Sequence, residues 1–151
     1  GTEAGITEPK STFSACFGAP FLPLHPGKYA EMLGKKMKEN KVNVWMINSG
    51  WSGGPYGIGK RMKLNYTRSM ITAALNGSLE NVEYEVHPIF GVLMPKHCPT
   101  VPDTILNPRY TWADREAYDI AAKKLAAEFI NNFEKYAAHV SEEIKSAAPK
   151  I

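Results

Sequence analysis

Gly54-Pro-Tyr-Gly-Ile-Gly-Lys60-Arg61 nearly matches the phosphate-binding pattern G-x-x-x-x-G-K-[ST]. The apolar run at residues 42–47 before it predicts a buried strand, and residues 66–75 after it predict a helix. A strand, a glycine-rich turn and a helix in this order indicate an α/β fold, with the turn as the first candidate for a ligand site.

Two residues argue against a true phosphate loop. Pro55 lacks the N–H group that such a loop directs at a phosphate, and Arg61 stands where a hydroxyl should bind magnesium. Asn65 is the better N-cap candidate, so residues 60–64 should precede the helix. A plain glycine-rich turn is therefore favoured, and a small phosphate-loop nucleotide-binding module using residues 54–61 is the alternative.

Composition narrows the class of protein. With 151 residues, a mass of 16.7 kDa and 44% hydrophobic residues, the chain has enough apolar material for one globular core. A net charge of +3 predicts no nucleic-acid partner, and no apolar stretch has the length of a membrane span. Cys16 and Cys98 lack a CxxC spacing, which favours a reducing compartment, and we expect a cytoplasmic location.

The sequence pattern divides the chain into three parts. Residues 1–12 predict a loop, residues 13–140 an α/β body, and residues 141–151 a polar, frayed tail. Within the body we expect a buried irregular segment at 13–24, helices at 28–39 and 112–140, strands at 42–48 and 82–86, a second apolar run at 89–94, and a surface connection at 95–110. The second of these helices should bury a stripe of residues spaced by four: Ala117, Ala121, Leu125, Phe129 and Phe133. These strands are too few for a self-contained α/β domain, so we expect the remaining strands elsewhere.

Most of the polar residues that could form a catalytic or metal site lack the spacing that such a site requires. The four histidines show no metal-binding spacing, and His97-Cys98, between prolines, predicts a surface loop rather than a catalytic pair. Glu83 and Glu85 predict a solvated strand face.

A group of basic residues is more informative, because it surrounds the glycine-rich turn: Lys60, Arg61, Lys63 and Arg68. Ligands of open α/β sheets bind where strands end, which is where this group is expected. Contact with an anion or a nucleotide and plain surface charge both remain open.

Five motifs in order along the chain resemble ATP-dependent phosphoenolpyruvate carboxykinase: Gly1-Thr-Glu-Ala-Gly-Ile-Thr-Glu-Pro9, Phe13-Ser-Ala-Cys-Phe-Gly-Ala-Pro-Phe21, Gly50-Trp-Ser-Gly-Gly54, Gly59-Lys-Arg-Met62 and Leu106-Asn-Pro-Arg109. The resemblance covers residues 1–138. It implies the C-terminal portion of a longer enzyme, forming part of a mixed-sheet mononucleotide-binding domain with a long C-terminal helix. The near-match to a phosphate loop would then be a decoy.

The resemblance also implies an activity. Enzymes of this family are carboxy-lyases of gluconeogenesis that convert oxaloacetate and ATP to phosphoenolpyruvate, ADP and carbon dioxide. It implies magnesium and manganese in the full-length enzyme, with the metal ligands and the catalytic residues outside this chain. The isolated 151 residues are therefore expected to be inactive, and a catalytically silent fragment is the remaining alternative.

For the residues of this chain, the resemblance implies an adenine pocket and a lid. Arg61 and Met62 would contact the adenine and ribose of ATP, and Thr67 would complete the pocket. The lid would contain Thr2, Glu3, Gly5, Thr7 and Glu8. The expected partners are the small-molecule substrates and the N-terminal part of the same polypeptide, with no nucleic acid and no membrane.

Overall fold

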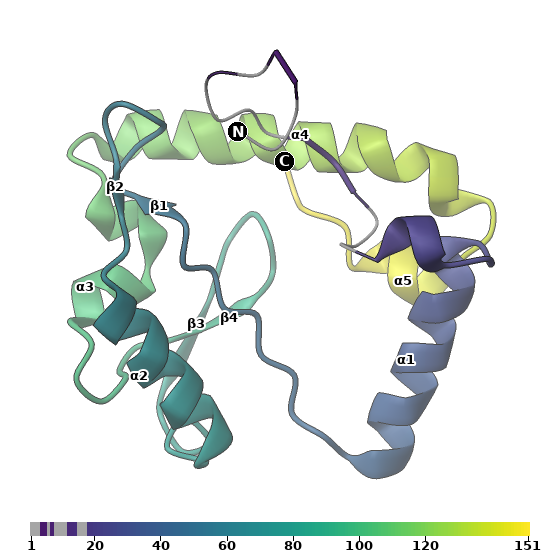
Figure 1. Ribbon diagram of the computed structural model, residues 1–151, viewed down its shortest axis with the longest axis horizontal. Helices are drawn as coiled ribbons and strands as arrows, with labels where there is room; N and C mark the ends of the chain where they lie inside the picture. The colour runs from purple at the N-terminus through teal and green to yellow at the C-terminus, as the bar shows by residue number, and fades with distance from the viewer. Residues whose placement is uncertain (1–3, 6, 8–11, 15–17) are drawn as a thin grey trace. The chain divides into compact units, whose positions relative to one another are not determined.

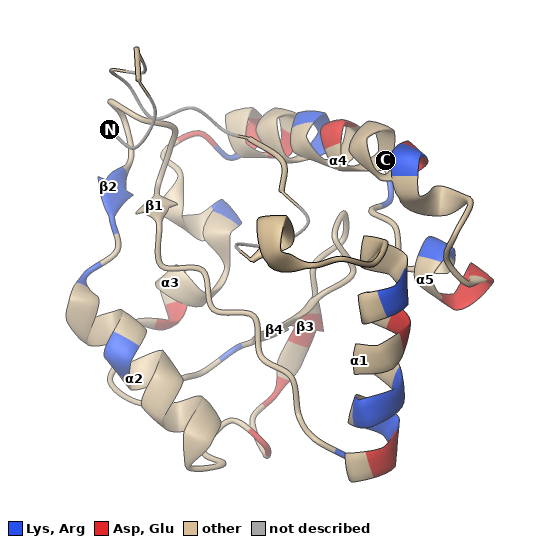
Figure 2. Ribbon diagram, turned by 45° about the vertical axis from the view of Figure 1, so that its right-hand side comes forward, with Lys and Arg blue, Asp and Glu red and all other residues tan. Residues whose placement is uncertain are grey.

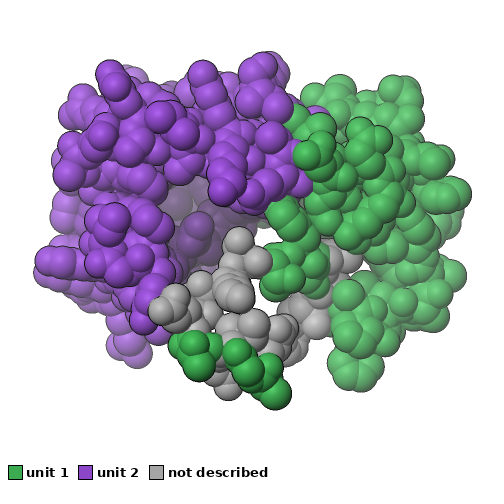
Figure 3. Space-filling model, turned by 90° about the horizontal axis from the view of Figure 1, so that it is seen from above, with its two compact units in different colours: residues 1–43, 130–147 green, residues 44–129, 148–151 purple. Residues whose placement is uncertain are grey.

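The computed structural model describes residues 4–5, 7, 12–14 and 18–151 (Figure 1). The chain forms two compact units, coloured separately in Figure 3: Gly1–Asn43 with Ile130–Ala147, and Val44–Phe129 with Ala148–Ile151. Helices and two small antiparallel sheets make up the described residues, which confirms the predicted α/β class.

The described residues of the first unit form η1 (Ala19–Phe21), α1 (Pro26–Asn40), the end of α4 (Arg115–Ala137) and α5 (Glu142–Ser146). Helix α1 confirms the prediction for 28–39. It begins at a proline, whose fixed φ suits the first helical position, and His25 Nδ1 accepts a hydrogen bond from the Gly27 amide at 3.1 Å. An ion pair of 2.9 Å between Lys38 and Glu143 joins α1 to α5.

Two predictions for this part of the chain are wrong. Residues 13–24 were expected to be buried; of these, residues 15–17 lie outside the described part of the chain, and among the others Phe13 and Leu24 are exposed and Phe21 is 86% exposed. Prolines interrupt regular structure here, so the apolar side chains do not share one face. The tail is not frayed either, because it forms α5, and beyond that helix the Lys150 amide donates to the Ile89 carbonyl at 2.7 Å.

The second unit contains two antiparallel hairpins and the helices around them. In chain order its elements are β1 (Trp51–Ser52), β2 (Lys60–Arg61), α2 (Leu64–Leu75), β3 (Tyr84–Val86), β4 (Leu93–Pro95), α3 (Asp103–Leu106), η2 (Pro108–Thr111) and the start of α4. Strand β1 pairs with β2, and β3 pairs with β4. Helix α4, with 23 residues, is the predicted long C-terminal helix.

The core of this unit consists of two clusters. One combines Ala73 of α2 with Leu79, Cys98 and Val101; the other combines Ile89 with three residues of α4: Tyr118, Ala122 and Ala126. The first cluster corrects the expected surface connection at 95–110, because the Cys98 side chain is 0% exposed. Apolar residues that separate prolines can fold inwards while the prolines stay outside.

The second cluster corrects the predicted stripe on α4. The buried residues lie one position later, at 118, 122 and 126, whereas Ala121, Leu125 and Phe129 are exposed. A spacing of four fits both rows equally well. The alanines at 122 and 126 are small enough for the loop at Ile89 to approach closely, which decides between them.

The apolar segment at 42–47 forms no strand in the structure. Its backbone is in no sheet of the described residues, and its side chains are exposed except for the half-buried Trp45, which packs against the first core cluster; Val44 is exposed by 58% and Met46 by 87%. A strand needs a hydrogen-bonded neighbour, and no described strand is paired with this segment.

Candidate functional site

The glycine-rich stretch forms the loop of the β1–β2 hairpin. Trp51 pairs with Arg61 and Ser52 with Lys60, and the Met62 amide donates to the Gly50 carbonyl at 3.0 Å. Positive φ angles at three glycines let the loop turn back: 84° at Gly53, 151° at Gly54 and 87° at Gly57.

This geometry excludes the phosphate-loop alternative. The loop leads back into an antiparallel strand instead of straight into a helix, and the amides of Ile58 and Gly59 donate inside the loop to the Pro55 carbonyl, at 3.1 and 2.8 Å. They are therefore not free to surround a phosphate. Helix α2 begins at Leu64, and its N-cap is Lys63 without a side-chain cap, so the expected cap at Asn65 is wrong.

The predicted contact residues for ATP follow one another at the end of this hairpin and the start of α2. Arg61 is exposed on β2, and its guanidinium makes no hydrogen bond or ion pair with any described residue. Met62 and Thr67 are half-buried; Thr67 lies in the first turn of α2, with its amide 3.4 Å from the Lys63 carbonyl. Of the predicted lid, Gly5 and Thr7 are exposed, whereas Thr2, Glu3 and Glu8 lie outside the described residues.

The sequence on either side of this hairpin carries charges of one sign. The sequence holds no Asp or Glu between Glu39 and Glu80, but five basic residues: Lys41, Lys60, Arg61, Lys63 and Arg68. Figure 2 shows basic residues on β2 and α2 without acidic neighbours in these elements. The Lys63 ammonium lies 5.7 Å from the centre of the Tyr66 ring, which keeps one of these charges near the start of α2. Such a stretch attracts anionic ligands.

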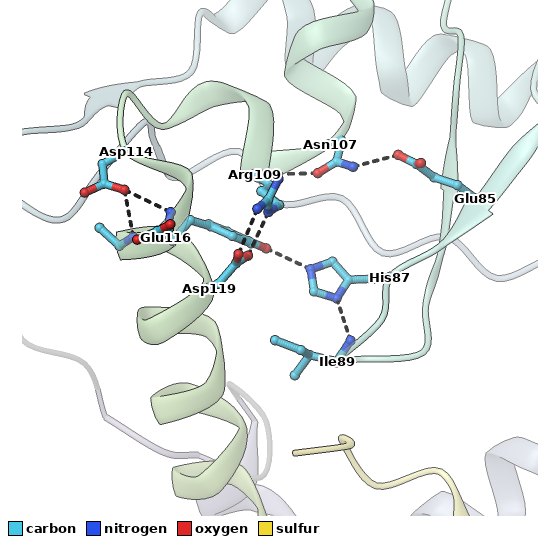
Figure 4. Close-up of polar contacts among 10 residues, drawn as sticks. Glu85, His87, Ile89, Asn107, Arg109, Asp114, Glu116 and Asp119 are labelled. Atoms are coloured by element: carbon cyan, nitrogen blue, oxygen red, sulfur yellow. Dashed lines mark hydrogen bonds and ion pairs between the residues drawn. The ribbon is translucent and has the colours of Figure 1, made fainter.

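A network of polar side chains connects β3, η2 and α4 (Figure 4). Arg109 of η2 binds both carboxylate oxygens of Asp119 on α4 at 2.8 Å, and Asn107 donates to Glu85 of β3 at 2.7 Å. The Arg109 guanidinium lowers the pKa of the Asp119 carboxyl. Glu85, predicted to be part of a solvated face, is half-buried and hydrogen-bonded, and only Glu83 is exposed, beside Lys96.

His87 and Tyr118 form the buried part of this network. His87 Nδ1 accepts hydrogen bonds from the amides of Ile89 and Phe90 at 3.2 Å, so the proton of the neutral ring is on Nε2, 2.8 Å from the Tyr118 hydroxyl. Burial lowers the pKa of His87, against the opposing charges of Asp119 and Glu85. Burial raises the pKa of the Tyr118 hydroxyl, so this group stays neutral like the buried histidine ring.

The other candidates offer no reactive group. His97 pairs with Asp103 at 2.9 Å on the surface, and burial raises the pKa of the Cys98 thiol, which lies in the core and not in the expected surface loop. The described residues contain no group of three or more His, Cys, Asp or Glu side chains that could hold a metal ion. No helix among them is long and apolar enough to cross a membrane.

Comparison with known proteins finds one family. The family model described as phosphoenolpyruvate carboxykinase matches residues 1–104. The phosphoenolpyruvate carboxykinase (ATP) of Christiangramia forsetii is 62% identical over 149 residues, and that of Thermus thermophilus is 56% identical over 150 residues. In both comparisons the match covers 99% of this chain and 28% of the relative, so the chain spans little more than a quarter of their length.

Proposed function

Because this chain belongs to the ATP-dependent phosphoenolpyruvate carboxykinase family, we propose that it is a segment of an enzyme that converts oxaloacetate and ATP to phosphoenolpyruvate, ADP and carbon dioxide. In this enzyme the segment holds the base end of ATP. Arg61 and Met62 contact adenine and ribose, and Thr67 completes the pocket. The observation that carries this assignment is an exposed guanidinium without a described partner, on a closed hairpin beside the half-buried Met62.

The chemistry of these residues suits a nucleotide. A planar guanidinium stacks on the face of a purine, and methionine provides an adaptable apolar wall. Met62 follows the last residue of β2, where the chain turns into α2, so it need not point to the side opposite Arg61 as it would within a strand. The surrounding basic residues favour a ligand that carries several negative charges.

The rest of the reaction belongs to the rest of the polypeptide. The chain spans 28% of its relatives, and the described residues hold no metal-binding group, so in this proposal the magnesium and manganese ligands, the oxaloacetate site and the catalytic residues lie outside the chain. The exposed apolar segment at 42–47 is where that remaining part would add strands. The lid formed by Thr2, Glu3, Gly5, Thr7 and Glu8 and the cytoplasmic location stay predictions.

Arg61→Ala in the full-length enzyme tests the assignment. We expect the KM for ATP to rise about tenfold, the effect of losing one desolvated stacking contact, with little change in the KM for oxaloacetate. Arg115→Ala is the matched control, because it removes an exposed guanidinium from α4, outside the predicted pocket and outside the basic group around the hairpin. An unchanged KM for ATP in Arg61→Ala would refute the adenine role. The isolated chain should form no phosphoenolpyruvate from oxaloacetate and ATP, even with manganese.

A further inference from the structure

Thr111, at the end of η2, holds the hairpin that carries Arg61. Its hydroxyl accepts a hydrogen bond from the Gly53 amide at 3.1 Å and donates one to the Pro108 carbonyl at 2.7 Å. The contact is also tight, because a Cβ atom at Gly53 would lie 2.9 Å from the Thr111 carbonyl oxygen. The hydroxyl thus links two segments that are 58 residues apart in the sequence.

The segment behind Thr111 is fixed to the rest of its unit. We call residues 107–111 the anchor segment. At its start Asn107 is bound to Glu85 of β3 and accepts a hydrogen bond from the Arg109 amide at 3.0 Å. In its middle the bidentate ion pair of Arg109 with Asp119 attaches it to α4. Bidentate pairs fix orientation as well as distance, so Thr111 is presented from a rigid support.

The hairpin transmits this constraint to Arg61. Gly53 directly follows β1, and β1 is paired with β2, where Trp51 faces Arg61. The loop is closed on itself, because a Cβ atom at Gly59 would overlap the Gly54 carbonyl oxygen. A tightly closed loop cannot tilt one strand without the other, so fixing Gly53 also fixes β2.

We infer that Thr111 is a positioning residue for the nucleotide: its hydroxyl sets the orientation of the β1–β2 hairpin so that Arg61 and Met62 meet the base. This inference rests on the proposed adenine pocket. Thr111 itself touches neither the base nor the phosphates, and its removal should weaken recognition of the base while contacts to the phosphates and the chemical step are kept.

The test uses the full-length enzyme with three substitutions. Thr111→Val keeps the shape and removes both hydrogen bonds, Thr111→Ser restores the hydroxyl, and Thr104→Val makes the same change at an exposed threonine of α3. We expect Thr111→Val to raise the KM for ATP about three- to tenfold, the usual effect of losing one hydrogen bond, because only the bond from the Gly53 amide reaches the hairpin. The kcat and the KM for oxaloacetate should stay within about twofold. Thr111→Ser and Thr104→Val should behave as the wild type.

Competition by inorganic tripolyphosphate separates positioning from general damage. Thr111→Val should leave its inhibition constant unchanged, because this probe has no base. Equal weakening of ATP and tripolyphosphate, or failure of Thr111→Ser to restore the KM, would overturn the inference. Gly53→Ala places a Cβ atom against the Thr111 carbonyl and so disturbs the same contact from the hairpin side. It should weaken ATP binding without weakening tripolyphosphate binding. If Arg61→Ala binds ATP more weakly but Thr111→Val binds it normally, the positioning role of Thr111 is refuted and the adenine pocket is retained. If Arg61→Ala binds ATP normally, the adenine pocket itself is refuted.

Discussion

Removal of the Tyr118 hydroxyl leaves a buried histidine proton without an acceptor. In Tyr118→Phe the His87 ring keeps its place, but its Nε2–H group loses the only oxygen within hydrogen-bonding distance among the described residues. The ring cannot switch tautomer, because Nδ1 accepts the amides of Ile89 and Phe90. With His87 only 4% exposed, water cannot replace the oxygen. An unsatisfied buried donor costs about 1–3 kcal/mol, which is the expected loss in free energy of unfolding.

Urea unfolding at pH 8, followed by tryptophan fluorescence, measures this loss, because the Trp112 ring lies 5.6 Å from the Tyr118 ring and reports locally. Tyr110→Phe is the matched control. Tyr110 is exposed, and its packing under Arg115 involves the ring and not the hydroxyl, so we expect a change within about 0.5 kcal/mol. A Tyr118→Phe variant as stable as Tyr110→Phe would refute the claim that this hydroxyl satisfies a buried donor.

Two further predictions concern the same unit. Because burial lowers the pKa of His87 in the folded protein, the unfolded chain takes up a proton at this residue first as the pH falls. The stability that His87 contributes is therefore complete above about pH 6.5 and is lost progressively below it. The difference in urea midpoint between pH 7.5 and 5.5 should therefore be smaller in His87→Gln, and equal differences would count against this mechanism. Gly59→Ala should disrupt the hairpin, because its Cβ atom would overlap the Gly54 carbonyl oxygen, and should raise the KM for ATP of the full-length enzyme more than about tenfold. Gly34→Ala in α1, where the new Cβ meets no atom within 4 Å beyond its chain neighbours and the nearby backbone of its own helix, is the control and should leave the KM for ATP unchanged.

Elements with local start and stop signals could be predicted from the sequence. Helix α1 begins with a proline, and α2 ends at Leu75 with Asn76 as its C-cap, before Gly77, which has a φ of 77°. The start of α4 was predicted three residues early, because Thr111 and Asp114 are both good caps. In the structure Asp114 accepts the amides of the next turn, and Thr111 is used by the hairpin.

The hairpin and its support could not be predicted, because their contacts are not local. Strand β2 has two residues and no alternating pattern, and it exists because the loop before it closes on Pro55. The contact of Thr111 with Gly53 and the ion pair of Arg109 with Asp119 depend on where distant elements pack. The residues of the candidate site were found through the family resemblance, and the residues that hold that site in place required the structure.

The predictions of burial that differ from the structure share a feature. Residues 42–47 are apolar on both faces, as in a strand covered on two sides, yet Met46 is 87% exposed. On α4 the row that includes Leu125 is exposed while the adjacent row is buried, so this helix presents a second apolar surface. Apolar residues that are exposed in this way indicate contacts that the described residues alone do not make. Arg61 is the corresponding polar case, because its exposed guanidinium has no partner among the described residues. In the proposed enzyme the remaining polypeptide covers the apolar surfaces, and ATP occupies the site at Arg61.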